Sequence, residues 1–230
     1  ENAKKFLHLQ YYLMENGKVA DRITEILIKK SLEGLKVCLI LDGIGSRKLS
    51  TDYIKRMRDH GIEFPFFKPV RFPNLTQKIN HRNHRKIIVI DGEIGYTGGI
   101  NLADKYLVEE VHKGFWRDTH LRIIGDSVKM LEAIFLVDRN YLTQNIYKNL
   151  EHYFPNLNSP PGQHIQIASS SPESGTANIL HAFFTAITTA KKSIRLISPY
   201  FIPDESLLMA LKTAASGGVK VEILLPGIVD

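Results

Sequence analysis

A short stretch of the chain, His81 to Asn101, concentrates the residue types that phosphodiester chemistry requires. It holds a His-x-Lys pair at His84 and Lys86, an aspartate at Asp91, and a Gly-Gly-x-Asn run that ends at Asn101. An imidazole nitrogen can attack phosphorus, while an ammonium group and an amide can donate to the charge that grows on the non-bridging oxygens. Because one spacing pattern fixes so many positions at once, we interpret the stretch as a phosphate-processing site.

The same stretch predicts a β-hairpin that would position these side chains. A run of apolar, β-branched residues begins after Lys86, an Asp-Gly pair at Asp91 signals a two-residue turn, and 94–97 form the return strand. Side chains two apart on a strand share a face, so His84 and Lys86 are expected to point the same way if the strand begins by His84. Turn chemistry alone explains Asp91, which makes it the weakest catalytic candidate.

Two neighbouring features add candidates to this site. The paired glycines Gly98 and Gly99 would let the backbone come close to a bound phosphate. Asp118 and His120 lie two apart at the start of a strand-like run, so their side chains would share a face. For Asp118 the competing interpretation is a strand-edge charge that pairs with a neighbouring arginine.

The chain is basic, with a formal net charge of +6 at pH 7 and a pI near 9.3. A basic surface favours polyanionic partners, either an anionic membrane surface or nucleic acid, and charge alone does not choose between them. Arginine suits bidentate phosphate recognition, so Arg71 and Arg85 are candidates for contact with a phosphate or a lipid headgroup.

The composition predicts a folded, metal-independent protein. With 230 residues and 43% hydrophobic content, the chain can bury a substantial core. Its single cysteine, Cys38, lies in an apolar run, which predicts a buried free thiol and excludes a disulfide framework. The nine histidines include no spacing typical of a metal site, so we expect neither a metal nor another cofactor.

The motif from His84 to Asn101 resembles the HKD signature of the phospholipase D superfamily, H-x-K-x4-D-x6-G-[GS]-x-N, and it matches every position of that signature. Further segments are similar to those of bacterial cardiolipin synthases, so that the resemblance covers nearly the whole chain. These segments are PVRFP at 69–73, RNHRK at 82–86, GYTGGIN at 95–101, WRDTHLRI at 116–123 and PYFIPD at 199–204.

The resemblance implies a mechanism and a set of roles. In the superfamily, two HKD motifs face each other, share one active site and transfer a phosphatidyl group in two steps through a phosphohistidine. His84 would be the nucleophile and the histidine of the other motif the acid and base, or the two would exchange roles. Lys86, Asp91 and Asn101 belong to the implied catalytic set. Superfamily members also use a downstream carboxylate to orient a catalytic histidine, a role that we assign to Asp118.

Two echoes indicate an internal repeat. The segment AKKFL at 3–7 returns as AKKSI at 190–194, an offset of 187 residues. The segment GLKV at 34–37 returns as GVKV at 218–221, an offset of 184 residues. The second offset would place a counterpart of His84 beyond the last residue, so we predict that the second HKD motif lies outside this chain. The alternative is a half-length protein that pairs two chains, as some superfamily nucleases do.

A loop rich in proline and asparagine divides the two copies. We predict a first phospholipase D-like repeat over 1–154, with its N-terminal strand and helix missing. A linker over 155–163 follows, and 164–230 form the N-terminal part of a second repeat.

Helix and strand patterns alternate along the chain. Helices are expected over 51–59 and from 128 onwards, and strands over 62–67 and 165–169. Alternating elements predict an α/β fold, and the hairpin predicts that its sheet is mixed. The expected fold is therefore a phospholipase D-like mixed β-sheet flanked by helices.

The leading functional prediction is a phosphatidyltransferase of the cardiolipin synthase type, which joins two phosphatidylglycerol molecules and releases glycerol. Its expected partners are phosphatidylglycerol, an anionic membrane surface and the second HKD half of the same polypeptide, with nucleic acid less favoured. Its expected location is the cell membrane, although no apolar run here approaches the about 20 residues that span a bilayer. The alternatives are a phosphodiesterase, nuclease or phospholipase that uses the same residues, and a catalytically inert phosphate- or membrane-binding half.

Overall fold

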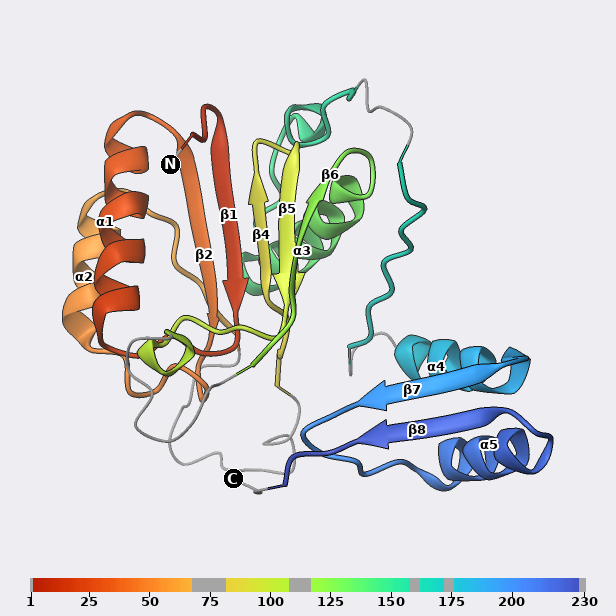
Figure 1. Ribbon diagram of the computed structural model, residues 1–230. Helices are drawn as coiled ribbons and strands as arrows, with labels where there is room; N and C mark the ends of the chain where they lie inside the picture. Colours follow the sequence, from red (N-terminus) through yellow and green to blue (C-terminus); the bar gives the residue numbers. More distant parts are fainter. Residues whose placement is uncertain (1, 68–81, 108–116, 158–161, 172–175, 228–230) are drawn as a thin grey trace. The chain divides into compact units, whose positions relative to one another are not determined.

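The computed structural model describes residues 2–67, 82–107, 117–157, 162–171 and 176–227 (Figure 1). It divides into two compact units, unit 1 over Glu1–Ile167 and unit 2 over Ala168–Asp230. The division lies C-terminal to the linker that the sequence predicts over 155–163. Each unit is described by itself.

Unit 1 is built on a six-stranded sheet in the order β3-β2-β1-β4-β5-β6. The strands β1, β2 and β3 run parallel, while β4 is antiparallel to β1 and to β5, and β6 is antiparallel to β5. The sheet is therefore mixed, as predicted. Its strands are β1 (Phe6–Tyr11), β2 (Lys36–Asp42), β3 (Phe66–Phe67), β4 (Ile87–Ile90), β5 (Ile94–Gly98) and β6 (His120–Ile124). Its helices are α1 (Lys18–Leu32), α2 (Thr51–Asp59) and α3 (Val128–Thr143), with short 3-10 turns η1 (Asp104–Tyr106) and η3 (Leu150–Tyr153).

Helices cover both faces of this sheet (Figure 1). On one face, Leu7 and Leu9 of β1 pack in a cluster that includes Leu27 of α1 and Met57 of α2. On the other face, Phe6 belongs to a second cluster with residues of α3. Because side chains alternate along a strand, every residue of β1 is buried between these two layers.

Three local predictions differ from the structure. The strand predicted over 62–67 shrinks to β3 and one isolated bridge between Glu63 and Cys38. The segment 165–169 forms no strand, because a strand needs a neighbour to complete its hydrogen bonds and the described residues supply none beside it. Ile90 pairs with Ile94, so the hairpin connection holds three residues rather than two.

Unit 2 contains α4 (Asn178–Thr189), β7 (Ser193–Ile197), α5 (Glu205–Ser216) and β8 (Lys220–Leu224). The strands β7 and β8 are parallel, and their small core includes Ile187, Ile194, Ala210 and Leu211.

Both copies of the predicted repeat form two parallel strands joined by a helix. The pair Phe6–Lys36 in β1 and β2 corresponds, at the two sequence offsets, to the pair Ser193–Lys220 in β7 and β8. In both copies the helix between the strands is followed, two residues after its end, by a glycine with a positive φ, 88° at Gly34 and 89° at Gly218. The β1-α1-β2 unit and the β7-α5-β8 unit thus share the same arrangement of strand, helix and parallel strand.

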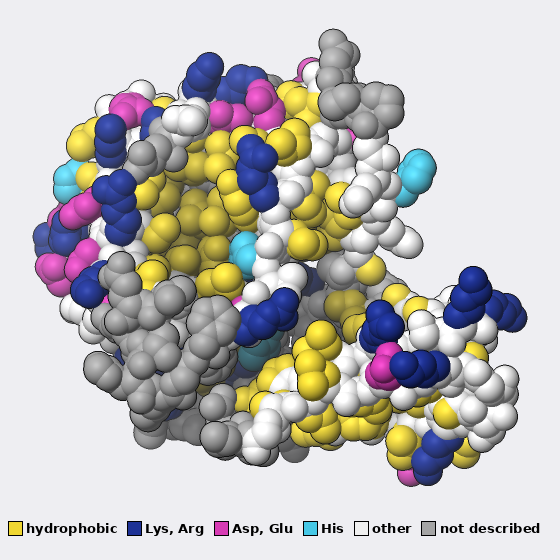
Figure 2. All heavy atoms as spheres, viewed as in Figure 1, with side chains coloured by type: hydrophobic (Ala, Val, Ile, Leu, Met, Phe, Trp, Pro, Cys, Tyr) yellow, Lys and Arg dark blue, Asp and Glu magenta, His cyan; other side chains and the backbone are white. Residues whose placement is uncertain are grey.

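Figure 2 shows how charge is distributed on one face of unit 1. Lys and Arg side chains over α1 and α2 are interspersed with Asp and Glu, while apolar side chains occupy the area between these helices and the later strands. Among the described residues on this face, the basic side chains over α1 and α2 therefore do not form a patch of a single charge. Among the helices of the described ranges, none combines the length and the apolarity needed to cross a bilayer.

Candidate active site

Of the predicted site residues that the structure describes, all but Asp91 lie at one end of the sheet in unit 1. The strands β1 and β2 end there, β4 and β6 begin there, and β5 arrives there through the hairpin. Thr97 pairs with Ile87, so Gly98 lies beside Lys86 in the next row, and Gly98 itself pairs with His120. This is the end at which open sheets with parallel strands commonly bind ligands.

His84 and Lys86 come from a loop, 82–86, that leads into β4 without regular structure of its own. The imidazole of His84 stacks on the ring of Tyr12, with ring centroids 4.1 Å apart and planes 16° from parallel. The Lys86 ammonium donates a hydrogen bond of 2.9 Å to the His84 carbonyl oxygen and lies 5.9 Å from the Tyr12 ring centroid. The side chains of His84 and Lys86 therefore lie close together, and the ring of Tyr12 lies beside both.

Electrostatics favour a neutral imidazole at His84. Partial burial lowers the pKa of His84 below its ordinary value, the charge of Lys86 lowers it further, and Asp42 acts in the opposite direction. A neutral imidazole keeps a nitrogen lone pair available, which is the form that a nucleophile requires.

Lys86, Asp118 and His120 are coupled electrostatically. Burial lowers the pKa of Lys86, and the carboxylate of Asp118 opposes that shift. Burial likewise lowers the pKa of His120, with Asp118 raising it and Lys86 lowering it. The structure thus brings Asp118 and His120 to the side of Lys86. The predicted role of Asp118 in orienting a catalytic histidine stays a prediction.

The two glycines of the motif are explained by protein contacts. A Cβ atom on Gly99 would lie 2.0 Å from Oδ1 of Asp118, and one on Gly98 would lie 2.4 Å from the carbonyl oxygen of Thr119 and 2.7 Å from Nδ1 of His120. Gly98 also has a φ of 153°, which side chains rarely allow. The glycines therefore give room to Asp118 and His120, and their predicted contact with a phosphate stays a prediction.

Asn101 follows β5 and has an unusual amide environment. Its Nδ2 donates to the hydroxyl of Tyr106 at 2.9 Å. Its Oδ1 is buried and has no hydrogen-bond partner within the described part of the chain. A buried amide oxygen without a partner is costly, so this position is not explained by the hydrogen bonds of the described residues.

The loop that carries Asn101 is fastened to the start of α1. Leu102 bridges to Met14, and the carboxylate of Asp104 accepts hydrogen bonds of 2.9 and 2.8 Å from the backbone N–H groups of Lys18 and Val19. Asp104 supplies the cap that Gly17 lacks, since Gly17 precedes the helix without a side chain. A glycine at a helix start was the only sequence signal that could have indicated such a partner.

Other predicted residues are not brought to this cluster. Asp91 lies at the far end of β4, where its carboxylate accepts hydrogen bonds of 2.8, 2.8 and 2.9 Å from the backbone N–H groups of Lys4, Lys5 and Phe6. We therefore assign Asp91 a structural role in place of the predicted catalytic one. Arg71 lies outside the described residues.

Arg85 is directed into the protein. Its Nη1 is 2.7 Å from Oδ2 of Asp138, a carboxylate on α3. A guanidinium held by a carboxylate is less suited to a headgroup, so the predicted substrate contact gains no support from this geometry.

No group of three or more His, Cys, Asp or Glu side chains in the described residues is placed to hold a metal ion. Cys38 is buried and free, and burial raises the pKa of its thiol.

A mixed sheet with helices on both faces and a His-x-Lys loop at one end define a phospholipase D-like protein. The family model described as cardiolipin synthase, PLD-like domain, matches residues 1–135 and 183–229. The chain belongs to this family.

Curated relatives share much of the sequence. The chain is 45% identical over 225 residues to a protein named cardiolipin synthase in Alkalihalophilus pseudofirmus, covering 97% of this chain and 45% of the relative. It is 43% identical over 229 residues to one named cardiolipin synthase 2 in Bacillus anthracis, covering 98% of this chain and 44% of the relative. The chain thus spans less than half the length of these relatives.

Solved structures show the fold. Phosphatidylserine synthase from Haemophilus influenzae Rd KW20 aligns with a TM-score of 0.68 at 14% identity, over 97% of this chain and 57% of that chain. Polyphosphate kinase from Porphyromonas gingivalis aligns with a TM-score of 0.56 at 16% identity, over 100% of this chain and 34% of that chain. At such low identity the likeness concerns the fold alone.

Proposed function

We propose that this chain carries one half of a cardiolipin synthase active site, in which His84 attacks the phosphorus of phosphatidylglycerol. The observation that carries the proposal is the cluster at the end of the sheet. A neutral imidazole at His84 stands next to the Lys86 ammonium, within a chain of the cardiolipin synthase family. A nucleophile and a cation beside it are what transfer of a phosphatidyl group needs.

The first step would form a bond between an imidazole nitrogen of His84 and phosphorus. The bond from phosphorus to the glycerol headgroup breaks, and the departing oxygen takes a proton from a general acid. From the superfamily resemblance, that acid is the histidine of a second HKD motif, which this chain does not contain. Lys86 and the Asn101 amide would donate to the non-bridging oxygens as negative charge grows there.

The second step would reverse these events with a new acceptor. The hydroxyl of another phosphatidylglycerol attacks phosphorus, gives its proton to the same general base, and releases the His84 nitrogen. The products are cardiolipin and glycerol. Both substrates are anionic lipids, so the enzyme would act at a membrane surface, and phosphatidylglycerol would be its partner there.

The test is production of cardiolipin in cells that lack it. The complete reading frame that encodes this chain is expressed as wild type, as His84→Ala and as His164→Ala, the last being a control at an exposed histidine outside the cluster. Lipids are then measured by mass spectrometry. Cardiolipin should appear with the wild type and the control and be absent with His84→Ala.

Two other results would redirect the proposal. Cardiolipin formed by a folded His84→Ala protein would remove His84 from the mechanism. Folded wild-type protein without cardiolipin would bring forward a phosphodiesterase or phospholipase with water as acceptor, and hydrolysis of phospholipids and of nucleic acid would be measured next.

A further inference from the structure

A second carboxylate outside the catalytic cluster organises the loop that holds His84. Asp138 lies on α3 and is 8% exposed. Its Oδ2 accepts hydrogen bonds from Gln10 at 2.6 Å, from Asn83 Nδ2 at 2.8 Å and from Arg85 Nη1 at 2.7 Å. Two of these three donors are the residues on either side of His84.

The backbone around His84 is held by the same set of groups. Oδ1 of Asn83 accepts from the backbone N–H of Arg85 at 3.0 Å, closing a short bridge across His84. The backbone N–H of Asn83 donates to the carboxylate of Asp42 at 3.3 Å. Because 82–86 has no regular structure, these side-chain contacts fix its backbone in place of the hydrogen bonds that a strand would make.

We propose that Asp138 is a positioning residue that sets the orientation of His84 for attack, with Asp42 supporting the same loop. This inference rests on the proposed function, in which His84 is the nucleophile and its orientation affects the rate of attack. Asp138 does not act on the substrate; it fixes Asn83 and Arg85, and they fix the residue between them. Displacement of a reacting group by about 1 Å can cost on the order of 100-fold in rate, so such support matters.

A comparison of the two repeat copies shows that the polar residues around Asp138 are not needed to form the β-α-β unit. At the repeat offsets, Gln10 corresponds to Ile197 and Asp42 to Pro226, so neither polar group has a counterpart in unit 2. The β7-α5-β8 unit forms its parallel strand pair without them. The polar side chains of the first copy therefore serve something that the β-α-β unit itself does not require.

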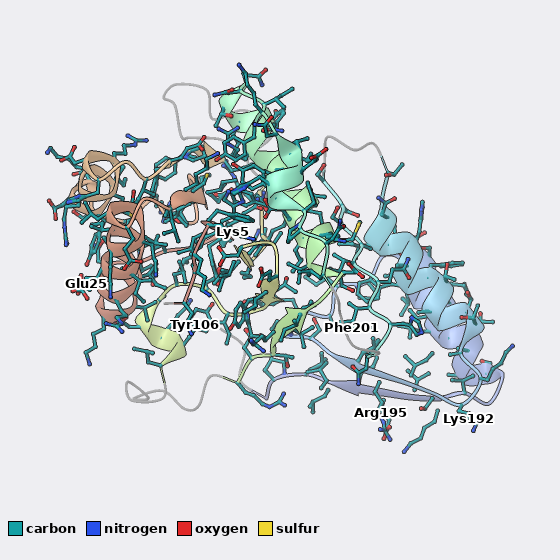
Figure 3. All side chains as sticks on the ribbon, turned by 90° about the horizontal axis from the view of Figure 1, so that it is seen from above. Lys5, Glu25, Tyr106, Lys192, Arg195 and Phe201 are labelled. Carbon is teal, nitrogen blue, oxygen red and sulfur yellow. The ribbon has the colours of Figure 1, made fainter. Side chains whose placement is uncertain are left out.

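The two copies also differ on the sheet face opposite the connecting helix. In unit 1 this face is covered by α3, and His8 of β1 is fully buried there. At the repeat offset its counterpart is Arg195, which extends from β7 away from α4 and α5 and pairs with Glu222 (Figure 3). The polar contacts between β1 and α3 thus belong to the copy that holds the HKD motif.

A matched control lies on the same helix. Glu132 of α3 is fully buried and has Oε1 2.7 Å from Nδ1 of His8, another residue of β1. Both carboxylates therefore tie α3 to β1 from inside the protein, but only Asp138 also binds the loop of His84. Replacing either one removes a buried polar contact, so a loss of thermal stability alone does not distinguish the two residues.

The first readout is the position of the His84 ring, which does not depend on activity. Stacking on Tyr12 shifts the imidazole proton resonances of His84 upfield in nuclear magnetic resonance spectra of this chain. Asp138→Asn and Asn83→Ala should each reduce this shift, and Glu132→Gln should leave it unchanged. An unchanged shift in both loop variants would overturn the proposal, as would an equal change in Glu132→Gln.

The second readout is turnover of the protein from the complete reading frame. Asp138→Asn and Asn83→Ala should lower kcat by about 100-fold with little change in KM, whereas Glu132→Gln should stay within about threefold of wild type. Equal losses in all three would assign Asp138 to stability alone. If wild type shows no turnover that depends on His84, the proposed function fails, and the ring shift still decides whether Asp138 positions the loop.

Discussion

The ring of Tyr12 lies over the imidazole of His84, with centroids 4.1 Å apart and an angle of 16° between the planes. Tyr12 is the first residue after β1, and His84 lies in the loop just before β4, the strand that pairs with β1. The two rings therefore lie close together because the strands next to them, β1 and β4, are paired in the sheet. The contact restricts the rotation of an imidazole that remains partly exposed to solvent.

Tyr12→Leu should lower turnover by removing this restriction. Stacked aromatic pairs contribute about 0.5–1.5 kcal/mol beyond their buried area. If that energy orients the imidazole for attack, its loss corresponds to a decrease in kcat of about two- to tenfold. Tyr12→Phe, which keeps the ring and removes only the hydroxyl, should behave like wild type. Equal rates for the Leu and Phe variants would show that stacking does not aid catalysis.

The pKa of His84 should lie below its ordinary value of 6.5, because burial and the charge of Lys86 both disfavour the imidazolium. Lys86→Met keeps a long apolar side chain and removes the charge, so the pKa of His84 should rise. Titration of the His84 ring protons by nuclear magnetic resonance measures it directly. Lys55→Met, at an exposed lysine paired with Asp59, is the control and should leave the titration unchanged.

The same shift predicts the pH dependence of stability. The unfolded chain takes up the His84 proton at the ordinary value, whereas the folded chain takes it up only at lower pH. The contribution of His84 to the free energy of unfolding should therefore be constant above pH 6.5 and decrease as the pH falls from 6.5 towards the folded pKa. Denaturation of wild type and His84→Ala across this range checks the sign, since an opposite trend would require a raised pKa.

Gly99→Ala should damage the site more than the fold. The new methyl group would lie 2.0 Å from Oδ1 of Asp118, so the carboxylate must shift from the position in which it interacts with Lys86 and His120. We expect a large decrease in kcat. The control is Gly227→Ala, where a methyl group meets no atom within 4 Å. Wild-type turnover in Gly99→Ala would show that the place of Asp118 is unimportant.

Asp91→Ala should lower stability and spare catalysis. Its carboxylate serves three backbone N–H groups at the start of β1, and their loss should decrease the free energy of unfolding by about 2–3 kcal/mol. Turnover per folded molecule should match wild type. Chemical denaturation and steady-state kinetics on the same preparation separate the two effects. A folded Asp91→Ala protein without activity would restore the catalytic role that the sequence suggested.

Local pattern predicted much of the fold. The hairpin around Asp91, the helix at 51–59, the helix from 128 and the repeat at offsets of 184 and 187 residues all rest on short-range signals, and the structure contains each of them. The strand over 165–169 failed because apolar alternation does not ensure a neighbouring strand. The hydrophobic pattern of a segment indicates which secondary structure it can adopt, while strand pairing depends on the rest of the chain.

The sequence predicted which residues form the centre of the candidate site, but not which distant residues contact them. The spacing of the HKD motif identified His84 and Lys86, but Asp138 meets Gln10 across 128 positions of sequence, and no local pattern connects them. The same holds for Asp104, which caps α1 from 86 positions away. Tyr12 was missed for this reason as well. Such contacts follow from the sheet order, which places β1 beside β4 and under α3.

The central claim, that His84 is the nucleophile, is tested most directly by trapping the intermediate. Protein from the complete reading frame is mixed with phosphatidylglycerol, quenched with denaturant at mildly basic pH, where both the phosphorus–nitrogen bond and the acyl esters survive, and digested for mass spectrometry. The account predicts a phosphatidyl group on the peptide that contains His84, absent in His84→Ala. Active protein that carries the group on a different histidine, or on none, would contradict it.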